Sequence, residues 1–152
     1  NGKESLTGTT KLDQSLGTLY SKYVKQFPCD VIVFYGEDDR PSDELLRGLR
    51  EGRPRLHFHQ LNSTWWSLPH GLRAEDRMRW RQSAYSIGYR HMIMWYAVRI
   101  WPFLTERGYT HVMRMDDDSY IYSAIRYNMF DYMRQNGKRY AFRQPCLETN
   151  VH

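Results

Sequence analysis

Three consecutive carboxylates, Asp116, Asp117 and Asp118, directly follow the apolar segment 110–115. Like charges at ~4 Å repel by about 4 kcal/mol in an effective dielectric of ~20, so the triplet needs a cationic partner. If segment 110–115 is a core strand, the triplet lies at its carboxyl end, where α/β sheets bind ligands. Carboxylate oxygens at such an edge suit Mg²⁺ or Mn²⁺, which would bridge to the phosphates of a ligand. We therefore predict that Asp116 and Asp118 bind a metal ion and that Asp117 contacts the substrate.

A polar turn is the simpler interpretation of the triplet, because Asp residues and the following Ser119 are favoured in turns. The three acids alone favour neither interpretation. Apolar residues flank them on both sides, from Val112 to Ile121, and a solvated turn needs no such burial. The context therefore favours a binding site.

Two arginines, Arg90 and Arg114, can complete such a site. Transfer of a sugar from a nucleoside diphosphate requires neutralisation of the charge that develops on the leaving diphosphate, which a metal ion can supply. Arg90 and Arg114 can add charge-assisted hydrogen bonds to the same phosphates. Arg114 is equally well interpreted as a structural partner of the aspartates.

The elements that must position these residues alternate between helical and extended patterns. The spacing of apolar residues predicts helices over 12–26, 41–52, 84–104 and 128–135, with Pro102 bending or restarting the third. Strands are predicted over 31–35, 56–61, 110–115 and 140–142, with a short extended piece at 121–122. This order indicates an α/β fold, with helices flanking a mainly parallel sheet.

The run from Val31 to Tyr35 is unbroken and apolar, which is typical of a strand buried on both faces. The segment 62–73, which contains Trp65 and Trp66, has no period and is interpreted as a long functional loop.

The composition is that of one packed domain: 152 residues, 41% of them apolar and 15% aromatic. The net charge of +5 comes mostly from separate arginines rather than basic runs, so nucleic acid is not indicated as a partner.

No apolar run approaches the ~18 residues of a membrane span. The chain begins at Asn1 without a leader, and we expect it to be part of something longer.

Two further features bear on the compartment of the protein. Cys29 and Cys146 have no metal or redox spacing, and they can pair with each other or with cysteines elsewhere. Asn62-Ser63-Thr64 is an N-glycosylation sequon, which belongs on a surface loop if the protein enters a secretory compartment.

The sequence leaves two other functions open. A metal-dependent phosphoesterase would need more acids near the triplet, and by strand order the candidates are Asp30, Glu37, Asp38 and Asp39. A carbohydrate-binding or nucleic-acid-binding module would use the basic and aromatic residues instead.

Four separated segments resemble the glycolipid 2-alpha-mannosyltransferase family, glycosyltransferase family 15. Trp66-Ser67-Leu68-Pro69 is similar to its W-S-Y-P loop, and Tyr89-Arg90-His91-Met92 to its Y-R-H/N-M motif. The segment 125–133 resembles its I-x-Y-D-V-F-x-x-M pattern, followed by N-x-K-x-Y-G-F at Asn136, Lys138, Tyr140 and Phe142. The resemblance covers residues 12–142.

This resemblance implies a GT-A-like nucleotide-diphospho-sugar transferase fold, truncated at both ends, with residues 1–152 forming a single incomplete catalytic domain. It implies GDP-mannose as donor, Mn²⁺ (or Mg²⁺) as cofactor, and retaining transfer of mannose in α-1,2 linkage to a glycan or glycoprotein acceptor. It also implies a type II membrane protein of the Golgi lumen, held by an anchor absent from this chain.

Carried over by position, the family's motifs suggest that Tyr89 lies near the transferred sugar and that Asp116 takes the place of its catalytic-site acid. Arg90, Arg114 and Trp66 are expected to contact substrate. The family's usual Glu-Pro-x-Val is replaced here by three aspartates and Ser119, closer to the DxD motif of galactosyltransferase-like GT-A enzymes. Such an enzyme is therefore the alternative, and which aspartate binds the metal stays open.

Overall fold

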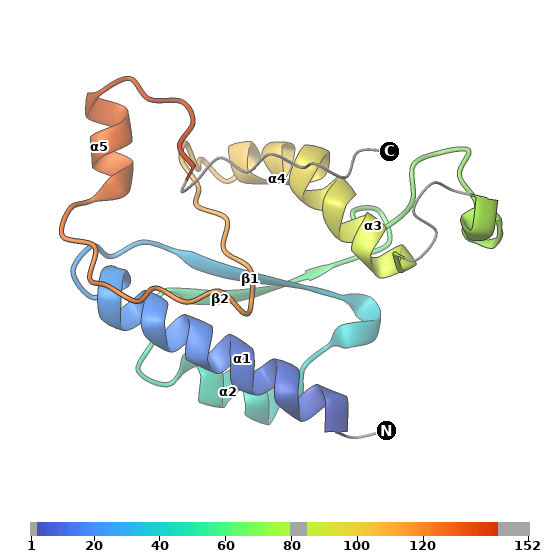
Figure 1. The fold of residues 1–152 in the computed structure, drawn as a ribbon, viewed down its shortest axis with the longest axis horizontal. Helices are drawn as coiled ribbons and strands as arrows, with labels where there is room; N and C mark the ends of the chain where they lie inside the picture. The colour runs from blue at the N-terminus through green and yellow to red at the C-terminus, as the bar shows by residue number, and fades with distance from the viewer. Residues whose placement is uncertain (1–2, 80–84, 143–152) are drawn as a thin grey trace.

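The computed structural model describes residues 3–79 and 85–142 (Figure 1). The first half contains helix α1 (Lys3–Leu19), its π-helical continuation η1 (Tyr20–Val24), strand β1 (Val31–Gly36), the 3₁₀ turn η2 (Glu37–Asp39), helix α2 (Asp43–Arg50) and strand β2 (Leu56–Leu61). The second half contains the 3₁₀ helix η3 (Ala74–Arg79), α3 (Ile87–Met94), the π-helical turn η4 (Trp95–Arg99), α4 (Ile100–Glu106) and α5 (Met129–Gln135).

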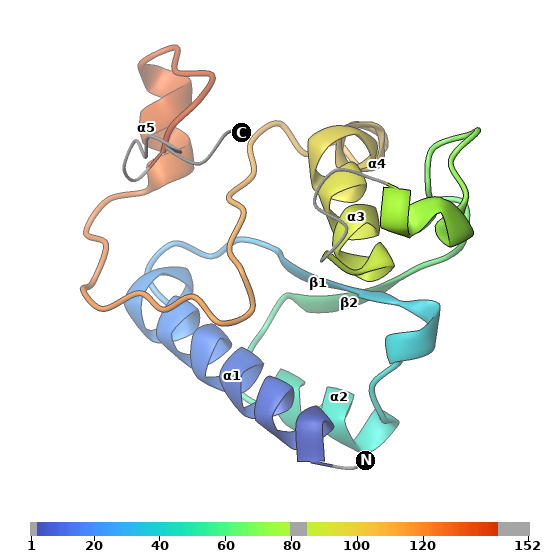
Figure 2. The ribbon, with the colours of Figure 1, turned by 45° about the vertical axis from the view of Figure 1, so that its right-hand side comes forward.

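β1 and β2 form a parallel pair in register from Val31 opposite Leu56 to Gly36 opposite Leu61, connected through α2. Helices α1 and α2 cover one face of this sheet, and α3 and α4 cover the other (Figures 1 and 2). The prediction of an α/β fold with a parallel sheet flanked by helices is confirmed.

Alternation along the strands explains the two layers, because successive side chains point to opposite faces. Val31 and Val33 pack against the buried cluster of α1 and η1, whereas Ile32 and Phe34 pack against the cluster of η4 and α4. β1 is therefore a strand covered on both sides, as its unbroken apolar sequence predicts.

Side-chain caps set the starts of three helices. Ser42 accepts a hydrogen bond from the Leu45 amide at the start of α2, and Ser86 accepts one from the Tyr89 amide at the start of α3. Asn128 caps α5 by accepting from the amides of Phe130 and Asp131. The polar residues before each apolar run therefore determine where these helices begin.

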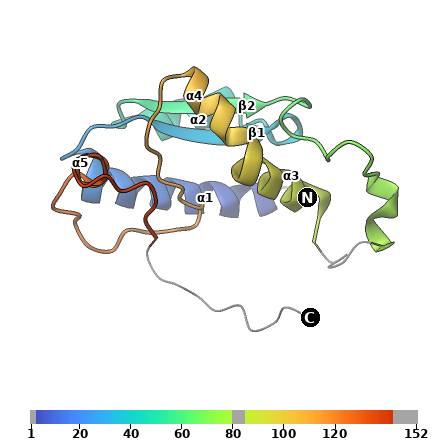
Figure 3. The same ribbon diagram turned by 90° about the horizontal axis from the view of Figure 1, so that it is seen from above.

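The expectation of strands at 110–115, 121–122 and 140–142 is wrong, because none of these segments has ladder hydrogen bonds to a neighbouring strand. Val112 and Met113 are each 40% exposed, so this apolar run is not a buried strand. The chain after α4 instead passes beside the sheet, and the part that follows the triplet then runs along α1 before reaching α5 (Figures 2 and 3). It is fastened there by hydrogen bonds from the Ile121 amide to Thr18 Oγ1 (3.1 Å) and from the Ile125 amide to the Lys22 carbonyl (3.0 Å).

The predicted helix 84–104 begins at Ile87 and changes from π-helical to α-helical geometry at Ile100. Pro102 lies in the first turn after this change, where a missing backbone amide is tolerated, so the expected restart near Pro102 is observed. Residues 80–84 lie outside the described part of the chain.

Cys29 is half-buried and forms no disulfide within the described part of the chain, and burial raises the pKa of its thiol. Its suggested pairing with Cys146 lies outside the described residues. Within the described residues, no helix has the length and apolar character needed to cross a membrane.

Candidate functional site

The aspartate triplet lies in a turn of the loop between α4 and α5. The Ser119 amide donates to the Asp116 carbonyl at 3.0 Å. The side chains of Asp116 and Asp118 are 60% and 56% exposed. The turn interpretation therefore describes the local backbone correctly, and the predicted position at the end of a core strand is wrong.

Two cations compensate the charge of the triplet, as its mutual repulsion requires. Arg114 Nη2 donates to Asp116 Oδ1 at 2.9 Å, and Lys11 Nζ lies 3.9 Å from Asp118 Oδ2. The Arg114 guanidinium also stacks over the Tyr96 ring, 4.4 Å from its centroid. Arg114 is thus a structural partner of the aspartates that is held against the helix layer.

Tyr96 joins this group although its sequence position suggested only a core residue. Burial raises the pKa of its hydroxyl, with Arg114 lowering it and Asp116 and Asp117 raising it further. The Tyr96 hydroxyl therefore stays neutral beside the triplet. The signal in the sequence was the hydroxyl group of Tyr96, a polar group on the otherwise apolar face of the predicted helix.

An aromatic face is exposed at the start of α3. The rings of Tyr85 and Tyr89 stack at 4.6 Å between centroids and 15° between planes, and they are 44% and 41% exposed. The Ser86 cap fixes the backbone beneath them. Stacking covers one face of each ring, and an outer face of the partly exposed pair is a surface on which a sugar ring can stack.

Trp66 packs at the carboxyl end of β1. A Cβ on Gly36 would lie 3.3 Å from Trp66 Nε1, so the absence of a side chain at Gly36 admits the indole. On its other side Trp66 meets the His91 ring, with centroids 5.8 Å apart. Burial lowers the pKa of His91, and nearby Arg99 lowers it further, so the imidazole is neutral at pH 7.

Arg99 holds the Trp66 loop in place by hydrogen bonds. The sequence did not identify this residue as part of the site. Its Nη1 donates to the carbonyl oxygens of Trp65 (2.6 Å) and Ser67 (3.1 Å) and to Ser67 Oγ (3.1 Å). The Trp65 ring packs edge-on against the buried Trp95 ring at 5.7 Å. The π-helical geometry around Arg99 is visible only in the structure, and such turns often occur at functional sites.

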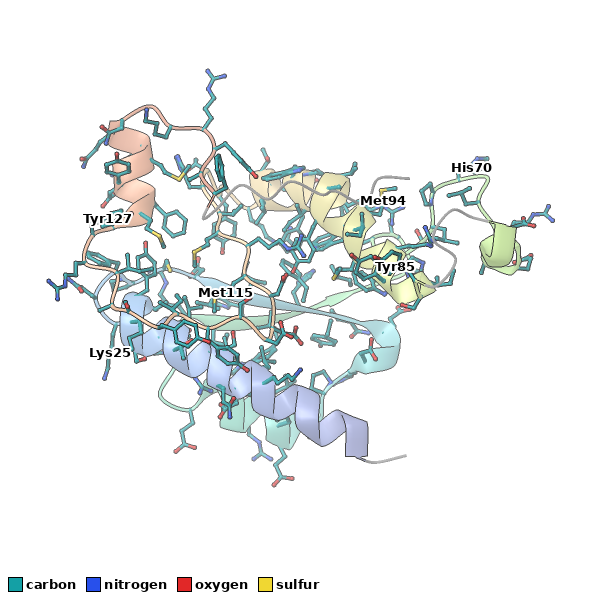
Figure 4. The ribbon with its side chains drawn as sticks, in the orientation of Figure 1. Lys25, His70, Tyr85, Met94, Met115 and Tyr127 are labelled. Atoms are coloured by element: carbon teal, nitrogen blue, oxygen red, sulfur yellow. The ribbon has the colours of Figure 1, made fainter. Side chains whose placement is uncertain are left out.

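The expected site residues therefore occupy three places: the triplet with Arg114, the loop of Trp66, and the start of α3 with Tyr89 and Arg90. Within the described residues, no hydrogen bond, ion pair or ring contact joins the triplet to Tyr89 or Trp66. Figure 4 shows this separation through Tyr85, beside α3, and Met115, which directly precedes the triplet. Arg90 is half-buried within α3.

The metal ligands expected from the sequence do not form a complete site in the described part of the chain. No three His, Cys, Asp or Glu side chains among these residues come together as metal ligands. The triplet can supply two carboxylates, and a Mg²⁺-like cation can take its other ligands from water and substrate phosphates. Ligation by Asp116 and Asp118 therefore stays a prediction.

Among the described side chains, the acids proposed for a phosphoesterase form no metal-binding cluster either. Asp30 lies at the amino end of β1, where its carboxylate accepts hydrogen bonds from Arg55 Nε and the Tyr109 hydroxyl, both at 2.8 Å. These hydrogen bonds, that of Arg55 above all, lower the pKa of Asp30. Asp30 therefore serves the fold, at the end of the strand opposite Gly36.

A shallow surface depression of about 480 Å³ lies between α1 and the segment that follows the triplet. Gln14, Thr18 and Ser21 line it from the helical side, and Tyr120 and Tyr122 line it from the loop. Polar side chains with two tyrosines are suited to contact with a hydroxyl-rich ligand.

Comparison with known proteins matches residues 7–150 to the family described as glycolipid 2-alpha-mannosyltransferase. Glycolipid 2-alpha-mannosyltransferase 1 of Candida albicans is 26% identical over 140 aligned residues, covering 86% of this chain and 32% of that protein. The X-ray structure of the mannosyltransferase Ktr4p from S. cerevisiae, in complex with GDP, matches with a TM-score of 0.69 and 21% identity, covering 86% of this chain and 36% of that chain. The chain thus shares the fold of Ktr4p and spans about a third of the length of these relatives.

Proposed function

The chain belongs to the glycolipid 2-alpha-mannosyltransferase family, and we propose that the protein transfers mannose from GDP-mannose to a glycan acceptor, in α-1,2 linkage and with retention of configuration. The observation that carries this proposal is the family match over residues 7–150, which includes the triplet, the Trp66 loop and the start of α3. The α-1,2 linkage and retention follow from the family alone.

The choice of donor is supported by the fold relative. Ktr4p was determined in complex with GDP, which is the group that leaves when GDP-mannose transfers its sugar. A diphosphate that gains charge as it leaves requires nearby cations. Arg114 suits this role because its guanidinium is already oriented by Tyr96 and Asp116 while its side chain is 45% exposed.

The remaining roles follow from position. Trp66 lies at the carboxyl end of β1, the edge where parallel sheets bind nucleotides, and we assign it to the donor side with Arg90. Tyr89, with Tyr85 stacked on it, offers an aromatic face to the transferred mannose. Asp117 is assigned to substrate contact within the triplet.

A divalent cation, Mn²⁺ or Mg²⁺, is part of the proposal, with Asp116 and Asp118 as two of its ligands. When bound, such a cation neutralises charge on the leaving diphosphate without proton transfer. The chain's own residues contribute carboxylate oxygens on a turn whose backbone is fixed by the Ser119 amide. We further propose a Golgi-lumen location, with membrane attachment outside this chain, on the basis of the family alone.

Calorimetric titration of the full-length protein with GDP-mannose tests the proposal. We expect binding that requires Mn²⁺ and is weakened about 10- to 100-fold by Asp116→Ala combined with Asp118→Ala. Asp43→Ala is the matched control, because it removes an exposed acid that pairs only within the α2 region, with Arg40 at 3.6 Å.

Unchanged binding by the double variant would contradict the site. Preference for another nucleotide sugar over GDP-mannose would favour the galactosyltransferase-like alternative. Linkage analysis of the product formed on a mannoside acceptor tests the α-1,2 assignment separately.

A further inference from the structure

The sequon Asn62-Ser63-Thr64 begins where β2 leaves the core. Leu61 ends the strand with none of its surface exposed, whereas the next three residues are all exposed. The printed sequence contains no other Asn-X-Ser/Thr tripeptide. The chain therefore turns from the sheet to the surface at Asn62.

The turn after Asn62 separates buried from exposed side chains. The Asn62 carbonyl accepts from the amides of Trp65 (3.0 Å) and Trp66 (2.8 Å), which closes the turn. The two indoles then pack inward, Trp65 on Trp95 and Trp66 on His91. Since the packing is carried by the tryptophans, the three sequon residues face solvent.

The side-chain amide of Asn62 uses its oxygen in the turn. Asn62 Oδ1 accepts a hydrogen bond from the Thr64 amide at 3.2 Å. No hydrogen bond from Asn62 Nδ2 is made within residues 3–79 and 85–142. A substituent on this nitrogen therefore breaks no internal contact, and an exposed, hydrated oligosaccharide has room over the turn.

We propose that Asn62 is N-glycosylated. The donor class is an oligosaccharide linked to a lipid diphosphate, delivered by the oligosaccharyltransferase of the secretory pathway. A bond forms between Asn62 Nδ2 and C1 of the first sugar, the bond from C1 to the lipid diphosphate breaks, the amide loses one proton, and the lipid diphosphate leaves. The inference rests on the proposed function only for its lumenal location.

Gel mobility with and without peptide-N-glycosidase F tests this modification. The full-length protein is directed into the secretory pathway of a eukaryotic cell by a cleavable signal, with a reporter sequon added at its C-terminus to confirm entry. We expect a glycosidase-sensitive shift that is due to Asn62, in addition to those of the reporter and of any sequon elsewhere in the full-length protein. Asn62→Gln and Thr64→Ala should abolish this shift, whereas the matched controls Ser63→Ala and Thr64→Ser should keep it.

A glycosylated reporter without modification at Asn62 would overturn the proposal, as would identical gel mobility of wild type and Asn62→Gln before glycosidase treatment. GDP-mannose binding, measured on the same preparations, reports on the proposed function independently. Loss of binding with an intact shift would count against the enzyme and in favour of the glycan site.

Discussion

Asp30 shows how a single carboxylate can connect three segments of this chain. It receives hydrogen bonds from Arg55, just before β2, and from Tyr109, just after α4, and His57 Nε2 lies 3.5 Å away. Arg55 has a φ of 62°, a left-handed conformation that is unfavourable for a residue with a side chain. The Asp30 carboxylate thus helps to hold a strained backbone at the entry to β2.

Replacing Asp30 with Asn should destabilise the protein by about 2 kcal/mol, because hydrogen bonds to a charged acceptor are lost from a site that is largely buried. Since folding lowers the pKa of Asp30, its contribution is fully present above its unfolded value of about 3.9 and is lost as pH falls through the folded value. Urea unfolding at pH 7 and in acid measures both effects.

The difference between Asp30→Asn and wild type should therefore shrink in acid. Asp43→Asn is the control, because its carboxylate is 81% exposed and should change stability by less than about 0.5 kcal/mol. An equal loss in the two variants would contradict the role assigned to Asp30.

At the scale of elements, η4 links the helix layer to the loop that follows β2. Arg99 projects from this π-helical turn and donates three hydrogen bonds to Trp65 and Ser67, more than 30 residues earlier in the chain. Trp95, in the same turn, is fully buried beneath Trp65. The Trp66 loop is therefore held by a helix rather than by its own turn alone.

Arg99→Gln should loosen the Trp66 loop without unfolding the sheet. We expect the amides of Trp65 and Trp66 to exchange hydrogen at least about 10-fold faster, which corresponds to about 1.4 kcal/mol of lost local stability. Exchange at β1 should change little. The measurement is hydrogen exchange followed by mass spectrometry or NMR.

Arg107→Gln serves as the matched control. The Arg107 guanidinium stacks over the Phe103 ring, 3.6 Å from the ring centroid, rather than on the Trp66 loop. Faster exchange of Trp65 and Trp66 in both variants would show that Arg99 has no specific role. Arg99→Lys should recover part of the protection, since an ammonium can make some of the three hydrogen bonds.

At the scale of the whole molecule, two helix layers cover a parallel pair of strands, and two half-buried histidines pack against aromatic rings. His59 packs against Phe34 and Phe103, and His91 packs against Trp66. Burial, above all, lowers the pKa of both imidazoles in the folded protein. Acid therefore favours the unfolded chain, in which these histidines can take up protons.

Stability should fall as pH drops below about 6.5, the ordinary pKa of histidine, and the decline should continue until the folded-state values are passed. Thermal unfolding between pH 7.5 and pH 5 measures this dependence. The combination of His59→Gln and His91→Gln should flatten the profile, although it lowers stability at pH 7.5. His70→Gln, an exposed substitution, should leave the profile unchanged, and a wild-type profile without slope would contradict this account.

The sequence by itself determined the features that depend on local pattern. The apolar run of β1 predicted the parallel α/β core, and the motifs at Trp66 and Tyr89 indicated the family. Helical patterns predicted the starts of α2 and α5 to within two residues, whereas the starts expected at residues 12 and 84 lie at Lys3 and Ile87. These features can be inferred because burial period and capping chemistry act over a few residues.

Only the tertiary structure decided where the aspartate triplet lies and what holds the site. Segment 110–115 has the composition of a strand, but a strand forms only with a hydrogen-bonded neighbour, and the described residues place none beside this segment. The contacts of Arg114 with Tyr96 and of Arg99 with Trp65 join residues that are distant in sequence. Such pairings follow from the packing of layers, which the local pattern does not encode.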